Sequence, residues 1–189
     1  MRIPQKAVHS SSHKKGKAMI NKEMNDALNK QVDAEMYSSN LYLAMYGWLA
    51  EKSLPGFAEW MRVQAAEEYD HCMRIFNYII ERGGNVQLGA IPKPGGSWKS
   101  VLELASEVVE HEEKVTGMIN NLMDIAMQQK DYAATAFLQW FVTEQVEEEN
   151  NVGDVLSRVK MIGDNTAALY HLDASLGQRS ASPAPEVQE

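Results

Sequence analysis

Four long segments of the chain repeat apolar residues every three or four positions, the spacing that places them on one face of an α-helix. A shorter segment near the C-terminus does the same. The repeats predict helices at about residues 21–51, 55–82, 98–129, 131–162 and 165–176. Most of the Gly and Pro residues fall outside these segments, as expected for an all-α protein.

The segments between the helices predict how the helices connect. Pro55 suits the first turn of the second helix, where its missing N–H needs no partner. Ser97 and Asp131 are predicted N-caps of the third and fourth helices. The Gly- and Pro-rich residues 83–96 cannot be helical throughout, and they are numerous enough to run along a bundle and join two parallel helices. The pattern predicts a four-helix bundle with one long crossover and a short fifth helix.

A polar residue interrupts the apolar face of each long helix near its middle. On the first helix the face is Leu28, Val32, Glu35, Ser39, Tyr42, Tyr46 and Leu49. Over all four helices the interruptions are Glu35, Glu68 and His71, Glu112, and Gln145 and Glu148. A carboxylate buried there without a partner would cost several kcal/mol or become neutral. Taken singly, each glutamate fits an exposed helix position as well as a buried one.

Together, the interruptions predict a metal site. Each residue advances a helix by about 1.5 Å, so near-middle positions of four similar helices lie at one level. Four buried glutamates carry a charge that two divalent cations cancel. Glu68-x-x-His71 is the motif of half a di-iron carboxylate site in a helical bundle. One imidazole among oxygen ligands suits iron or manganese better than structural zinc.

Charge and composition narrow the function classes. Residues 1–18 carry five Lys or Arg and no acidic residue, so subtracting them from the net charge of −8 leaves −13 on the rest. An acidic body disfavours nucleic acid and favours cations. Cys72 is the only cysteine, which excludes an intrachain disulfide and a CxxC pair. No apolar run reaches the roughly 18 residues of a membrane span, and no signal peptide is evident, so we expect a cytoplasmic protein.

The ends of the chain lack any hydrophobic period. We expect residues 1–20 to be a disordered basic leader or a start-site extension, and residues 177–189 to be a disordered tail. One domain is then expected at residues 21–176.

The interrupting residues resemble the ferroxidase centre of bacterial non-haem ferritins, as do the adjoining segments 36–42 and 137–141. The resemblance covers about residues 21–176. The matching positions are Glu35, Tyr42, Glu68, His71, Glu112, Gln145 and Glu148. The family fold is a four-helix bundle with a short fifth helix, assembled as a shell of twenty-four subunits.

The resemblance implies a role for each matching residue. Glu35, Glu68 and His71 would hold one iron, and Glu68 would bridge to a second iron held by Glu112 and Glu148. The implied reaction is the oxidation of Fe(II) by O2 or H2O2, followed by storage of Fe(III) as a mineral.

Residues around this pair of irons also match. Gln145 would lie beside the second iron, and Tyr42 would hydrogen-bond near the centre and supply an electron. The third iron site of the bacterial branch matches Glu67, Glu144, Glu147 and Glu148. Glu144, Glu147 and Glu149 are also typical of a solvated acidic helix face.

Three related classes fit the sequence less well. Haem-binding bacterioferritins usually have a second Glu-x-x-His on the fourth helix and a methionine after the bridging glutamate, where this chain has Gln145-x-x-Glu148 and Tyr69; we expect no haem. A DNA-protecting mini-ferritin would use the basic leader to bind phosphates but should lack the fifth helix. A di-iron oxygenase or a ribonucleotide reductase radical protein usually has two Glu-x-x-His motifs and a longer chain.

Overall fold

The computed structural model describes residues 20–178, and every regular element within that range is a helix. The helices are α1 (Lys22–Glu51), α2 (Pro55–Glu81), α3 (Val101–Gln128), α4 (Tyr132–Ile162) and α5 (Thr166–Leu176). No helix among these is long and apolar enough to cross a membrane. The predicted all-α class and the five helices are confirmed.

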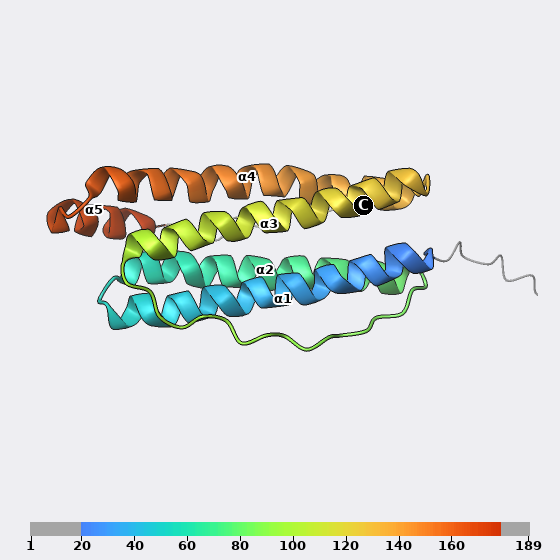
Figure 1. Cartoon of the computed structure of the whole chain (residues 1–189), viewed down its shortest axis with the longest axis horizontal. Helices are drawn as coiled ribbons and strands as arrows, with labels where there is room; N and C mark the ends of the chain where they lie inside the picture. The colour runs from blue at the N-terminus through green and yellow to red at the C-terminus, as the bar shows by residue number, and fades with distance from the viewer. Residues whose placement is uncertain (1–19, 179–189) are drawn as a thin grey trace, which may run out of the picture.

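The four long helices form two antiparallel hairpins, α1 with α2 and α3 with α4, which lie against each other (Figure 1). The segment between α2 and α3 runs back along the whole bundle, so these two helices are parallel, as the sequence predicted. The short helix α5 lies at the end of the bundle where α4 ends, and it packs against α2. This topology brings the middles of all four long helices to one level.

The buried apolar side chains fall into two clusters. One cluster includes Tyr42, Phe57 and Trp60 and extends to α5. The other includes Leu28, Ile75 and Phe141 and lies toward the N-terminal half of α1. The polar interruptions identified in the sequence lie between these clusters. The core is therefore two apolar halves on either side of a polar layer.

The crossover is attached to α1 by a ladder of hydrogen bonds. The side chains of Asn25, Asn29 and Asp33 stand one turn apart on α1. In that order, they accept hydrogen bonds from the backbone N–H groups of residues 85, 87 and 89, at 2.9, 2.6 and 2.8 Å. Four helical residues advance about 6 Å, close to the rise of two extended residues. The matching rises keep the extended segment in register with the helix.

Two local predictions were wrong. Ser97 does not cap α3; the N-cap is Ser100, whose hydroxyl accepts from the N–H of Glu103. The Glu103 carboxylate accepts in turn from the N–H of Lys99, the residue before the cap, in a variant of the capping box. Tyr46 is 38% exposed, and Met45 takes the inward position instead.

The predicted ends of the chain lie mostly outside the described residues. The expected disordered leader and tail fall on residues 1–19 and 179–189, of which the structure describes nothing. Ile20 is an exception, because its side chain is buried and its N–H donates to the carbonyl of Arg82. Ile20, which the sequence analysis assigned to the leader, is therefore packed against the helical domain.

Candidate metal centre

The polar layer consists of four carboxylates and one imidazole that come from four different helices. The four glutamates are at most 4% exposed, and His71 is 6% exposed. They are Glu35 of α1, Glu68 and His71 of α2, Glu112 of α3 and Glu148 of α4. All five interrupting acid and imidazole side chains are therefore buried rather than solvated.

Glu35, Glu68 and His71 form a compact group. One ligand atom from each lies within 4.8 Å of the others, and no other set of three or more such side chains in residues 20–178 is this close. Nδ1 of His71 lies 3.6 Å from Oε2 of Glu68. The edges of Trp140 and Phe141 flank the imidazole ring at centroid distances of 5.4 and 6.0 Å. The three donors are thus held close enough to surround one cation.

Two oxygens of this group lack a hydrogen-bond donor. Oε2 of Glu35 and Oε2 of Glu68 are buried, and no N–H or O–H in the described chain reaches them. Burial raises the pKa of both carboxyls well above the ordinary value. The Glu68 charge raises the pKa of Glu35 further, and the Glu112 charge raises the pKa of Glu68, whereas hydrogen bonding with Glu35 lowers the pKa of Glu68. Without a cation, these groups favour the protonated state. A divalent cation would supply the missing partner for both oxygens.

Glu112 is held on both of its oxygens. The hydroxyl of Tyr42 donates to Oε1, and the amide of Gln145 donates to Oε2 at 3.2 Å. The same amide lies 3.2 Å from the hydroxyl of Thr116. Burial raises the pKa of Glu112, whereas the bonds from Tyr42 and Gln145 oppose that rise. Tyr42 and Gln145 therefore both contact Glu112.

Glu148 faces Glu112 from α4. Burial and the nearby Glu112 charge raise its pKa from 4.5 to about 7, and a hydrogen bond of 2.9 Å from the amide of Gln64 partly offsets this rise. Glu112 and Glu148 lie outside the compact group of three. The Glu112 charge nevertheless acts on Glu148, so these two carboxylates could share a second cation.

The remaining predicted acids lie at the margin of the layer. Glu67 is half-buried, and its charge raises the pKa of both Glu68 and Glu148. Glu144 is half-buried and Glu147 is exposed. The structure does not gather these three acids with Glu148 into a compact group like that around His71.

Three polar residues at the centre were not predicted. Gln31 donates to Glu35 at 2.9 Å, and Gln64 donates to Glu148. Nε2 of His111 lies 2.7 Å from the hydroxyl of Ser38, and burial lowers the pKa of His111 to about 4. The two glutamines had a sequence signal, since each precedes a predicted ligand by four residues on the same helix face. His111 had none beyond its place beside Glu112.

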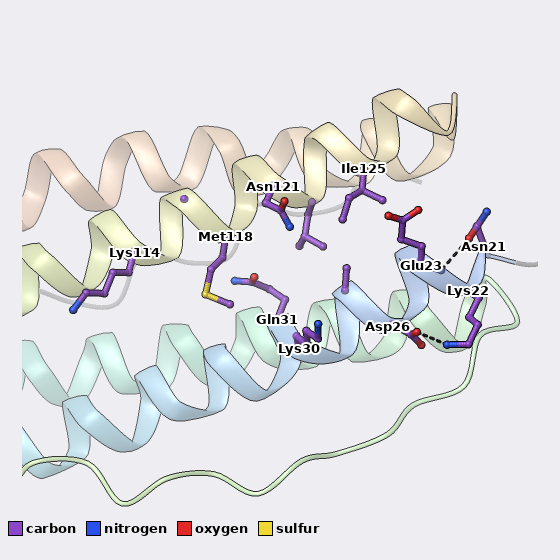
Figure 2. A pocket seen from close by; sticks show the side chains of 13 residues that line it. Asn21, Lys22, Glu23, Asp26, Lys30, Gln31, Lys114, Met118, Asn121 and Ile125 are labelled. Carbon is purple, nitrogen blue, oxygen red and sulfur yellow. Dashed lines mark hydrogen bonds and ion pairs between the residues drawn. The ribbon is translucent and has the colours of Figure 1, made fainter.

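A groove between α1 and α3 reaches the centre at Gln31. It has a volume of about 860 Å³, and Figure 2 shows Gln31 and Met118 between the two helices. Lys30 and Lys114 also line it, and an ion pair of 2.5 Å joins Lys22 to Asp26 nearby. Gln31 is therefore the side chain between this groove and the Glu35 carboxylate.

The raised carboxyl pKa values predict how the stability of the metal-free protein changes with pH. A carboxyl whose folded-state pKa lies above its unfolded value stabilises the fold at low pH, and this contribution disappears as pH rises through the folded pKa. For Glu148 the window runs from 4.5 to about 7. We expect the metal-free protein to lose roughly 2 to 3 kcal/mol from this group between pH 5 and pH 8.

Thermal unfolding of chelator-treated protein against Glu148→Gln tests this expectation. His111 acts in the opposite sense, because its lowered pKa makes the fold lose stability as pH falls from 6.5 toward about 4. Glu148→Gln keeps His111 and removes only the carboxyl, so the difference between the two proteins isolates Glu148. Parallel stability curves for the two proteins would contradict the prediction.

Comparison with known proteins agrees with this arrangement. A family model described as a ferritin-like domain matches residues 25–162. A bacterial non-heme ferritin of Bacteroides fragilis is 40% identical over 161 residues, covering 85% of this chain and all of that protein. One of Campylobacter jejuni is 37% identical over 155 residues, covering 82% of this chain and 93% of that protein.

The solved structures that resemble this chain are also ferritins. The open-pore ferritin of the archaeon Archaeoglobus fulgidus superposes with a TM-score of 0.85 at 45% identity, covering 86% of this chain and all of that one. A humanized archaeal ferritin superposes with the same TM-score at 44% identity, covering 87% and 99% of the two chains. The matched region contains all four long helices and the polar layer, and the chain belongs to the ferritin family.

Proposed function

We propose that this protein stores iron and that its polar layer is a di-iron ferroxidase centre. The observation that carries the proposal is the set of four buried carboxylates and one imidazole at a single level, with two oxygens that no donor of residues 20–178 reaches. The first metal position lies beside Glu35, Glu68 and His71. The second lies beside Glu112 and Glu148, with Gln145 as a neighbour.

Charge and ligand chemistry support Fe(II) as the substrate. Two Fe(II) ions would neutralise the four carboxylates, which would lose their protons as the metal binds. Hard carboxylate oxygens stabilise Fe(III) more than Fe(II), and they thereby favour electron transfer to O2 or H2O2. Two Fe(II) ions together supply the two electrons that reduce O2 to peroxide or peroxide to water. A single imidazole leaves the product weakly enough bound to move on.

Tyr42 is positioned to take part in this reaction. Its hydroxyl donates to Glu112, and burial and the Glu112 charge raise its pKa well above the ordinary value. A phenol that stays protonated beside the second position can orient Glu112 through this hydrogen bond. We assign it this positioning role.

The fate of the product belongs to the same proposal. Glu67, Glu144, Glu147 and Glu148 would hold a third iron on its way to the mineral, and twenty-four chains would enclose that mineral. Kinship with ferritins supports the shell. The electrostatic effect of Glu67 on Glu68 and Glu148 supports a third cation close to the first two.

Rapid mixing tests the proposal directly. Metal-free protein under argon is mixed with two Fe(II) per chain and then with O2, and the absorbance of Fe(III) is followed. We expect most of the iron to oxidise within seconds, far faster than in buffer. Mass photometry of the same sample should give the mass of twenty-four chains. Oxidation at the buffer rate would overturn the ferroxidase assignment, and a mass of one or two chains would overturn the shell.

A further inference from the structure

Two buried glutamine side chains each donate to a different carboxylate of the centre. Gln31 is 1% exposed, and its Nε2 lies 2.9 Å from Oε1 of Glu35, one turn along α1. Gln64 is 3% exposed, and its Nε2 lies 2.9 Å from Oε2 of Glu148, across the interface between the two hairpins. A buried amide is rarely retained without a hydrogen-bonding purpose, because burying it unpaired costs free energy.

The hydrogen bond from Gln31 gives the two oxygens of Glu35 different surroundings. Oε1 accepts from the amide, whereas no donor in the described part of the chain reaches Oε2. Glu35 is the residue that clusters with Glu68 and His71. A carboxylate held at one oxygen cannot rotate freely about its last bond. The hydrogen bond therefore leaves one oxygen available and sets its direction.

A neutral donor suits this task better than a charged one. A lysine or arginine at either position would form an ion pair with the carboxylate and would compete with a cation for its charge. An amide donates at every pH and leaves the full negative charge in place. Gln31 also lines the groove that Lys30 and Lys114 line (Figure 2), whereas Glu35, to which its amide donates, does not line it.

We propose that Gln31 and Gln64 are positioning residues, each of which fixes one carboxylate for one metal position. Gln31 orients Glu35 at the first position, and Gln64 orients Glu148 at the second. Neither is proposed to bind the metal. The inference rests on the proposed function, because it assumes that these carboxylates take divalent cations. It adds that the two positions are tuned separately, by amides on different helices.

Co(II) titration of the assembled protein tests whether each glutamine acts on a different metal position. Gln31→Met and Gln64→Met keep the side-chain length and remove the donor. Partners that orient a metal ligand typically contribute 10- to 100-fold in affinity. We expect calorimetry to show about tenfold weaker Co(II) binding at one position in each variant. Anomalous scattering from crystals soaked in limiting Co(II) identifies that position: the first in Gln31→Met and the second in Gln64→Met.

The controls separate this inference from the proposed function. Gln128→Met makes the same chemical change at an exposed position of α3, and it should bind Co(II) like the unaltered protein. If the unaltered protein takes up no Co(II) at these carboxylates, the proposed function fails. Suppose instead that the unaltered protein binds Co(II) at these carboxylates. If both variants then bind Co(II) as it does, or each variant is weakened equally at both positions, only the positioning role is overturned. Should one variant fail to fold, as judged by helical content, the other still decides.

Discussion

Replacing Glu68 with alanine is expected to abolish fast Fe(II) oxidation, with a loss of at least 100-fold in initial rate. Glu68 belongs to the compact group with Glu35 and His71, and its charge also raises the pKa of Tyr42 at the second position. Glu68 therefore acts on groups at both positions. In the proposed centre, removing it would deprive each cation of a ligand and leave three carboxylates for two divalent ions. Stopped-flow absorbance after mixing with Fe(II) and O2 measures the effect.

Glu68→Ala should slow Fe(II) oxidation without changing the fold or the assembly of the protein. Glu68 is buried with an oxygen that no donor reaches, so its removal takes away an electrostatic cost as well as packing. Mass photometry should give the same assembly as the unaltered protein. Asp70→Ala removes one carboxylate from an exposed position two residues further along α2, and it should keep the full rate. His71→Ala should be slowed less, because the carboxylates remain. An unchanged rate in Glu68→Ala would disprove the assignment.

The faces of the long helices could be predicted because periodicity is a local property. On α4, spacing by three and four residues predicts an inward face of eight residues, and all eight are buried: Ala134, Leu138, Phe141, Gln145, Glu148, Val152, Val155 and Val159. The one clear error on α1 follows from the same rule. After Tyr42 the next inward residue can be three or four positions on, and the choice of Tyr46 over Met45 depends on what the other helices present. Sequence spacing alone does not contain that information.

Contacts between helices were the part that the sequence could not supply. Gln64 precedes Glu68 by one turn, yet it donates to Glu148 on another helix. The ladder from α1 to the crossover requires the extended segment to run beside Asn25, Asn29 and Asp33, and no motif in that segment indicates this. The α3 N-cap is different. Its Ser-x-x-Glu capping box at Ser100 was present in the sequence and indicated the true start.

A second large effect is expected at Gly56, where α5 docks on the start of α2. A Cβ at this position would lie 1.7 Å from the carbonyl oxygen of Asp173 and 3.0 Å from the backbone nitrogen of Gly177. Neither is the end of a flexible side chain, so α5 must move. The Asp173 side chain also accepts from the N–H of Phe57 at 2.9 Å, and α2 has no cap of its own from Leu54. Gly56→Ala would therefore break the contact that caps α2.

We expect Gly56→Ala to cost about 3 kcal/mol or more and to lower the thermal midpoint by roughly 6 to 12 °C, with faster proteolysis within α5. The loss includes the burial of Leu172 and Leu176, which pack only while α5 is docked. Gly47→Ala is the matched control. Gly47 lies inside α1 with nothing within 4 Å of its added Cβ, so alanine should stabilise the helix by about 0.5 to 1 kcal/mol. Glycine-to-alanine substitution is therefore expected to destabilise the protein at Gly56 and to stabilise it at Gly47, because only at Gly56 does another backbone segment occupy the space of the added Cβ. Equal midpoints for the two variants would show that α5 is not held as closely as the structure indicates.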